Sequence, residues 1–158
     1  NVNNYLRLDK GTNHGIKKHM GVMGDEGVVG IGREVSPHFC SVMSILHSQS
    51  RIKAAIKGTG YFGTLVWPGG NPKVMELRAI PKHAKPSVGD TITTSGYSQI
   101  FPKDIPLGVI TSDKQKSGEN FLTIEVELFI EIGKLRYVYV VENLFKEEHE
   151  LLDQATNE

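Results

Sequence analysis

The sequence predicts an all-β protein, and three of its features support that fold class. Apolar and polar residues alternate with a period of two, clusters of Gly, Pro and Asn separate the alternating segments, and helical spacing is nearly absent before residue 142. Alternation of this kind places the apolar side chains on one face of a half-buried strand. Many short strands separated by turn residues are typical of barrels and sandwiches.

The predicted strands follow one another along the whole chain. The clearest covers residues 121–130, where Leu122, Ile124 and Val126 alternate with polar residues. Residues 51–57 alternate in the same way between aliphatic and basic side chains. The remaining predicted strands are residues 5–9, 28–35, 39–47, 61–67, 74–80, 90–95, 107–112 and 137–141.

The strongest interruption is the Pro-Gly-Gly-Asn-Pro run at residues 68–72, which suits a hinge. We therefore expect two small β-barrel domains, residues 1–67 and residues 68–141. Each barrel closes on itself, which removes exposed sheet edges. In this division, a strand at the end of one domain can complete the barrel of the other domain.

The end of the chain, residues 142–158, has a different pattern. Leu144 and Phe145 are followed seven residues later by Leu151 and Leu152, with acidic residues between them. This spacing fits a helix. We expect either a short C-terminal helix packed on a barrel or an acidic, disordered tail.

Composition narrows the possible functions. The 158 residues are 39% hydrophobic and 23% charged, as in ordinary folded proteins. Eighteen basic and eighteen acidic residues cancel, whereas nucleic-acid binding relies on a basic surplus, so no nucleic-acid partner is expected. No apolar run reaches the ~18 residues that cross a bilayer. The start at Asn1 reads as an excised fragment, so a missing signal peptide says little about the parent protein.

Three patterns that suggest chemistry are better explained as turns or core. Residues 58–63 match G-x-G-x-x-G, but β-forming residues follow where a dinucleotide site needs a helix, so a hairpin is expected. Residues 9–15 lack the spacing of a calcium loop and predict a turn with Asn13 and Gly15 in left-handed positions. Six scattered histidines and Cys40, which suits a buried apolar position, lack ligand spacing, so no metal or cofactor is expected.

One enzymatic alternative remains open, a divergent double-barrel serine hydrolase. It uses Ser95 as the nucleophile, His14 or His38 as the base and Asp90 to orient the base, because a triad is defined by geometry rather than by sequence order. The flanks of Ser95 lack the G-x-S-x-G elbow, and Asp90 lies in a turn-like Val-Gly-Asp run.

Residues 96–110, GYSQIFPKDIPLGVI, predict a tight corner between two strands. The two prolines fix φ and remove two N–H donors, so the segment cannot continue a central ladder. Tyr97, Ile100 and Phe101 supply apolar groups to this corner. Packing in the core is their expected role, and a contact with a protein partner is the alternative, because aromatic residues anchor interfaces.

A series of short motifs, each weak alone, follows the order found in a known bacterial family. The motifs are Leu8-Asp9-Lys10-Gly11 through Gly15, Met20-Gly21-Val22, Gly27-Val28-Val29-Gly30, Glu34-Val35-Ser36-Pro37, Pro81-Lys82-His83-Ala84, Val88-Gly89-Asp90, Thr94-Ser95-Gly96 and Ile100 to Val109. Across residues 5–141 the chain resembles the extracytoplasmic part of MreC, the rod-shape-determining protein. Asp104 stands where the family usually has Gly, and a left-handed turn is still expected because Asp tolerates that conformation.

The resemblance implies two small β-barrels that follow a membrane span and a coiled coil in the parent protein, on the periplasmic side of the cytoplasmic membrane. It implies a non-catalytic scaffold of the cell-elongation machinery that maintains rod shape. The implied partners are MreD, RodA, a class B penicillin-binding transpeptidase and, through the membrane, the actin-like MreB, together with self-association. A barrel that binds a cell-wall fragment is a further alternative.

Overall fold

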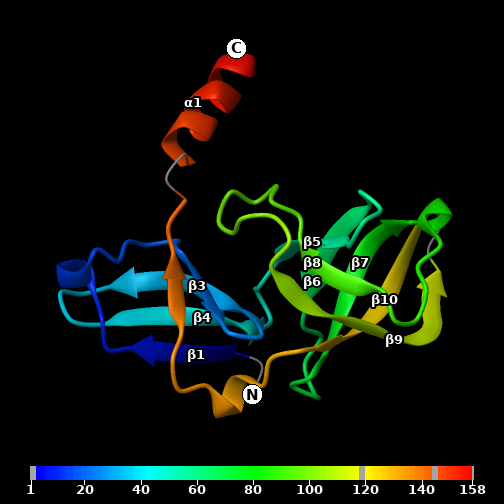
Figure 1. Cartoon of the computed structure of the whole chain (residues 1–158), viewed down its shortest axis with the longest axis horizontal. Coiled ribbons are helices and arrows are strands. Elements are labelled where there is room, and N and C mark those ends of the chain that lie inside the picture. The colour runs from blue at the N-terminus through cyan, green and yellow to red at the C-terminus, as the bar shows by residue number, and fades with distance from the viewer. Residues whose placement is uncertain (1–2, 118–119, 144–145, 158) are drawn as a thin grey trace.

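The structure is a computed structural model that describes residues 3–117, 120–143 and 146–157. Two β-bodies lie side by side, and a helix projects away from them (Figure 1). One body is an open five-stranded sheet in the order β1-β4-β3-β2-β11, and the other is a closed barrel in the order β10-β7-β6-β5-β8-β9. All the strand pairs in both bodies are antiparallel.

The elements alternate with short turns along the described chain. The open sheet contains β1 (Asn3–Leu8), β2 (Gly21–Gly24), β3 (Gly27–Val35), β4 (Cys40–His47) and β11 (Tyr139–Val141). The barrel contains β5 (Ile52–Ile56), β6 (Phe62–Val66), β7 (Val74–Pro81), β8 (Thr91–Thr94), β9 (Pro106–Ser117) and β10 (Phe121–Leu128). The helical elements are the 3-10 turns η1 (Thr12–His14), η2 (Lys82–Ala84) and η3 (Ile132–Lys134) and the helix α1 (Lys146–Thr156).

The predicted all-β fold with one closed barrel is confirmed, whereas a second closed barrel is not. In the described residues β1 and β11 form the two edges of the open sheet and do not pair with each other. The chain passes from the open sheet to the barrel before the expected domain boundary at residues 67–68. Strand β5 already pairs with β8, and β6 pairs with β7, inside the barrel. The run at 68–72 is the connection between β6 and β7. β11 is a terminal strand that joins the other body by pairing with β2.

A single apolar core runs through both bodies. In β10 the alternation seen in the sequence places Leu122, Ile124 and Val126 inside and the intervening residues toward solvent. The bodies touch where β3 begins. A Cβ atom on Gly27 would lie only 2.6 Å from the Pro106 carbonyl oxygen, so this approach requires a residue without a side chain.

The predicted turns are largely as expected. β5 and β6 form a hairpin over residues 58–63, and Asp104 adopts the expected left-handed conformation, with φ 71°. Gly15 is also left-handed, with φ 82°, whereas Asn13 lies inside η1 instead. Cys40 is buried, and burial raises the pKa of its thiol above the ordinary 9.0.

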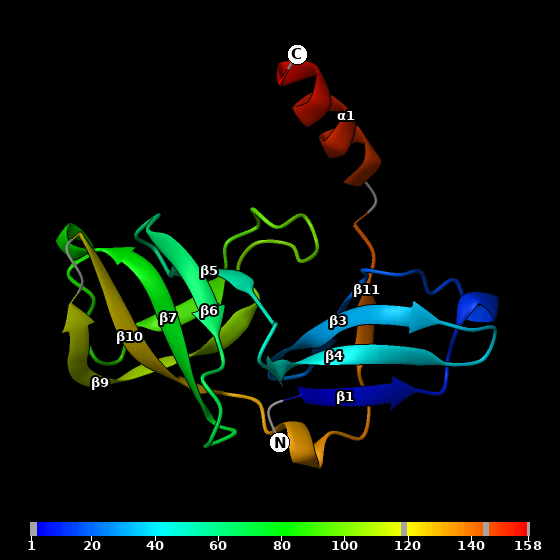
Figure 2. The same cartoon turned by 180° about the vertical axis from the view of Figure 1, so that it is seen from behind.

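The helix α1 forms, but its described leucines do not pack on either body. The helix stands clear of the sheet and the barrel in both views (Figures 1 and 2). Leu151 and Leu152 are 65% and 66% exposed. Leu144 and Phe145 lie outside the described residues. No helix in the described part of the chain combines the length and the apolar character needed to cross a membrane.

Candidate protein-interaction surface

The corner loop, residues 95–105 between β8 and β9, is fastened at its base by Thr94. The Thr94 hydroxyl donates to the Pro102 carbonyl at 2.6 Å and accepts from the Ile105 N–H at 2.9 Å. The Thr94 N–H donates to the Ile105 carbonyl at 2.9 Å, and the Asp104 N–H donates to the Thr94 carbonyl at 3.0 Å. These four hydrogen bonds hold the two ends of the loop together, so the predicted corner is a fixed structural unit.

The underside of the corner loop is part of the core. Phe101 is 3% exposed, and its ring lies against Gly21 of β2, where an added Cβ would come within 2.5 Å of the ring. Ile100 is half-buried and packs against the same core. Phe101 therefore serves the core packing expected of it and ties the loop to the open sheet. It offers no surface to a partner.

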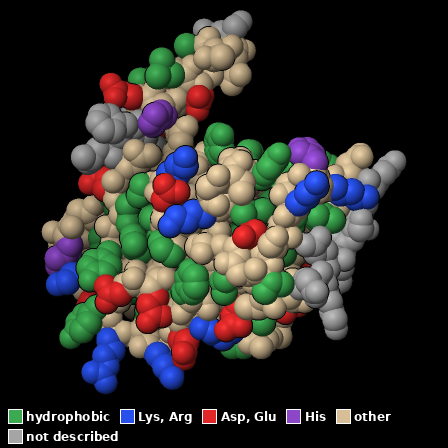
Figure 3. Space-filling model, turned by 45° about the vertical axis from the view of Figure 1, so that its right-hand side comes forward, with side chains coloured by type: hydrophobic (Ala, Val, Ile, Leu, Met, Phe, Trp, Pro, Cys, Tyr) green, Lys and Arg blue, Asp and Glu red, His purple; other side chains and the backbone are tan. Residues whose placement is uncertain are grey.

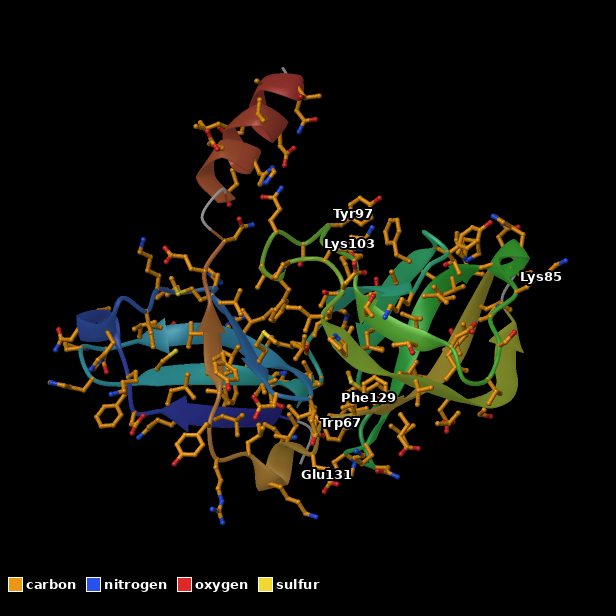
Figure 4. All side chains as sticks on the ribbon, viewed as in Figure 1. Trp67, Lys85, Tyr97, Lys103, Phe129 and Glu131 are labelled. Atoms are coloured by element: carbon orange, nitrogen blue, oxygen red, sulfur yellow. The ribbon has the colours of Figure 1, made fainter. Side chains whose placement is uncertain are left out.

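The upper side of the loop carries an exposed aromatic pair, Tyr97 and Phe62. Tyr97, which is labelled in Figure 4, is 67% exposed. Its ring centroid lies 4.6 Å from that of Phe62, which is 39% exposed. The Tyr97 N–H donates to the Ser95 hydroxyl at 3.2 Å. Sequence reasoning missed Phe62. Its outward place in the alternation, beside the buried Gly63, is the signal that would have found it.

Two hollows flank the corner loop and end at the point where the chain leaves β11. One has a volume of about 390 Å³ and lies toward Lys17 and Lys18, and the other, of about 640 Å³, lies toward Lys103. The Asn143 side-chain N–H donates to the Gln99 carbonyl at 2.6 Å, which joins the loop to this exit. Loop, aromatic pair and hollows together form one irregular face.

A third hollow lies at the junction of the two bodies, on the side where Trp67 and Glu131 are labelled in Figure 4. Its volume is about 700 Å³, and its walls come from β1, the β6–β7 connection and η3. Trp67 is 6% exposed, and its indole N–H donates to the Asn71 carbonyl at 3.1 Å. The one hydrogen-bond donor of this tryptophan side chain is thus already bonded to a carbonyl of the same chain.

The residues of the alternative serine triad are not brought together. Asp90 precedes β8 and Ser95 follows it, so about five residues at roughly 3.3 Å each separate them. An Asp90 carboxylate oxygen accepts from the Ser87 N–H at 2.9 Å. The turns that carry His14 and His38 lie at the end of the open sheet remote from the barrel (Figures 1 and 2). Within the described residues, no three His, Cys, Asp or Glu side chains form a metal-binding group.

The fold defines a class of protein, a small all-β module in which an open sheet and a closed barrel are joined through a shared core. A family model described as "Rod shape-determining protein MreC, barrel core" matches residues 1–142. The chain belongs to the MreC family of cell shape-determining proteins, which confirms the resemblance seen in the sequence.

Curated relatives and solved structures agree with this assignment. The cell shape-determining protein MreC of Listeria monocytogenes is 28% identical over 113 residues, which cover 70% of this chain and 38% of the relative. MreC of Escherichia coli is 24% identical over 85% of this chain and 36% of its own length. This chain therefore spans little more than a third of those relatives. The crystal structure of MreC from Pseudomonas aeruginosa has a TM-score of 0.81 at 26% identity and covers 89% of this chain and 90% of that one.

Proposed function

We propose that this chain is the extracytoplasmic part of a non-catalytic scaffold that organises cell-wall synthesis and so maintains rod shape. Membership of a cell shape-determining family supports this role. A structural neighbour described as the major periplasmic domain of MreC, with a TM-score of 0.64, supports the location. Anchoring by a membrane span in the parent protein belongs to the same proposal.

The first partner we propose is a class B penicillin-binding transpeptidase. A solved structure of Helicobacter pylori MreC in complex with the penicillin-binding protein PBP2 has the same fold, with a TM-score of 0.63 at 18% identity to this chain. MreD, RodA, further copies of this chain and, through the membrane, MreB are the other proposed partners. All of these would be bound by recognition, without bond making or breaking.

The corner loop is the surface we assign to the transpeptidase, with the aromatic pair at its centre. Tyr97 and Phe62 are large, exposed and held by each other, so they lose little conformational freedom when a partner covers them. Aromatic residues on a fixed base are the usual anchors of protein interfaces. Ile100, which the sequence offered as a third contact, is half-buried against the core on the underside of the same loop.

Binding of this kind influences an enzyme only if the scaffold prefers one of its conformations. A scaffold that binds the active conformation tenfold more tightly shifts the equilibrium tenfold toward it, which corresponds to about 1.4 kcal/mol. A few well-placed side chains supply a difference of that size.

The test measures binding of this chain to the purified transpeptidase ectodomain by calorimetry. Tyr97→Ala and Phe62→Ala should each weaken the affinity about tenfold or more. Tyr137→Ala is the matched control, because Tyr137 is 86% exposed but lies before β11, outside the corner loop. Its affinity should equal that of the wild type.

The possible outcomes test the scaffold role and the assignment of the corner loop separately. An unmodified chain that does not bind at high micromolar concentration would contradict the scaffold role. Binding that survives Tyr97→Ala and Phe62→Ala would leave that role in place but exclude the corner loop as the contact.

A further inference from the structure

The end of the barrel remote from the open sheet is crossed by the connection between β7 and β8. In the barrel order these two strands lie on opposite sides, three steps apart in either direction. Residues 81–90 must therefore pass over the barrel mouth. We call this end, made of residues 57–61, 81–90 and 120–121, the barrel tip.

The three segments of the barrel tip are held against one another. The Lys82 N–H donates to the Asn120 carbonyl at 3.4 Å, and the Lys57 N–H donates to the carbonyl of residue 91 at 2.9 Å. The rings of Tyr61 and His83 meet edge to face, with centroids 5.2 Å apart. The side chains at the tip are thus presented on one ordered surface.

The surface of the barrel tip is basic. Lys57, Lys82 and Lys85 are all exposed, and the exposed His83 lies among them. Among the described residues no carboxylate lies within ion-pair distance of these three lysines. Asp90, the acidic residue of the 81–90 segment, already accepts a hydrogen bond from the Ser87 N–H. The lysines therefore face solvent with their charge uncompensated by the described residues.

Lys85 occupies a backbone conformation that disfavours a side chain. Its φ is 48°, and Pro86 follows it directly. A residue with a Cβ is disfavoured in this left-handed region relative to glycine. Glycine would relieve this strain, and the lysine found here is displayed at the outermost end of the barrel (Figure 4).

The barrel tip also carries two exposed apolar side chains. Val88 is 57% exposed in the 81–90 segment, and Phe121 is 52% exposed where it pairs with Pro81. In the space-filling view, lysine, histidine and hydrophobic side chains adjoin on this part of the surface (Figure 3). A soluble polyanion would neutralise the lysines but would leave both apolar side chains in water.

We infer that the barrel tip is a membrane-contact surface that binds a bilayer rich in anionic lipid. The lysines meet lipid phosphates, while Val88 and Phe121 enter the boundary between headgroups and acyl chains. The proposal goes beyond the scaffold role and does not depend on it. Its probe is lipid rather than a transpeptidase, so either proposal can fail while the other stands.

The test is flotation of the chain with vesicles of phosphatidylglycerol and phosphatidylcholine, compared with vesicles of phosphatidylcholine alone. The chain should float with the anionic vesicles only. Binding should fall when salt is raised to ~0.5 M, since screening weakens the attraction of lysine for lipid phosphate. Each lysine near an anionic surface contributes about fivefold in affinity, so the triple tip variant should bind about a hundredfold more weakly. That variant is Lys57→Gln, Lys82→Gln and Lys85→Gln.

A second triple variant controls for net charge. It removes three lysines that lie elsewhere, each within 4.0 Å of a glutamate. The control substitutions are Lys17→Gln, Lys18→Gln and Lys134→Gln. This variant should bind the vesicles almost as well as the wild type. An equal loss in both triple variants would overturn the proposal, because it would show attraction by overall charge alone.

The apolar side chains decide between a membrane and a soluble polyanion. Val88→Ser with Phe121→Ser should weaken vesicle binding about tenfold or more and leave binding of inositol hexakisphosphate unchanged. Thermal unfolding checks that the variant is folded. Vesicle binding that is unaffected by these two substitutions, or a wild-type chain that does not float, would overturn the proposal.

Discussion

At the scale of single residues, the corner loop depends most on the Thr94 hydroxyl, which bridges the Pro102 carbonyl and the Ile105 N–H. Thr94→Val keeps the shape of the side chain but removes both hydrogen bonds and leaves a buried N–H without its acceptor. We expect the free energy of unfolding to fall by about 1–3 kcal/mol, measured by denaturant titration. Thr94→Ser keeps the hydroxyl and should cost clearly less. Equal stability of Thr94→Val and wild type would contradict this account.

Cys40 gives a prediction about pH. Burial raises the pKa of its thiol above 9.0, so the folded chain holds the proton more tightly than the unfolded chain does. The resulting stabilisation is fully present below pH 9 and is lost as the pH rises through the native pKa. The difference in unfolding free energy between wild type and Cys40→Ala should therefore shrink as the pH rises above 9. A difference that is constant with pH would contradict the prediction.

Sequence reasoning reached some residues of the corner loop and missed others, for identifiable reasons. The left-handed Asp104 could be predicted because the family that the sequence resembles usually has Gly there and Asp tolerates the same conformation. The different burial of Tyr97, which is exposed, and of Phe101, which is 3% exposed, could not be predicted. They depend on Gly21, far away in the sequence, which leaves room for the Phe101 ring. Phe62 was missed because its partner ring comes from another segment.

At the scale of elements, β11 and α1 contribute differently to stability. Removing residues 148–158 deletes most of α1, in which Asp153 accepts an exposed hydrogen bond from the Gln99 side chain at 3.0 Å. We expect the unfolding free energy to change by less than about 1 kcal/mol. Removing residues 136–158 also deletes β11 and uncovers the buried Val22, which should cost more than ~2 kcal/mol. Thermal unfolding of both truncated chains checks this, and equal losses would contradict it.

Element prediction succeeded where the local pattern is clear and failed where that pattern is weak or where distant pairing decides. The alternation in β10 identified that strand to within two residues of its end. β2, Gly21–Gly24, was missed because two of its four residues are glycines and no alternation is visible. The Pro-Gly-Gly-Asn-Pro run was interpreted as a hinge between barrels, but it joins two neighbouring strands of the same barrel. Turn residues mark where a strand ends and not which sheet the next strand joins.

At the scale of the whole molecule, the shared core and the contact at Gly27 couple the two bodies. We expect the wild type to unfold in a single transition, with Trp67 fluorescence and far-UV circular dichroism giving the same midpoint. In Gly27→Ala the new Cβ would lie 2.6 Å from the Pro106 carbonyl oxygen and force the bodies apart. Stability should then fall by about 1–3 kcal/mol and the two midpoints should separate.

The control for this coupling is Gly133→Ala. No atom lies within 4 Å of a Cβ added at Gly133, so this variant should keep coincident midpoints. Separate midpoints in the wild type itself would contradict the idea of one cooperative unit.

The return of the chain to the open sheet has a mechanical consequence. β1 and β11 are opposite edges of that sheet. All the barrel strands lie between β4 and η3 in the sequence. A force that pulls the two ends of the polypeptide apart is therefore carried first by the ladders of the open sheet. The barrel bears no load until that sheet has ruptured, so stretching a single molecule should release the sheet before the barrel.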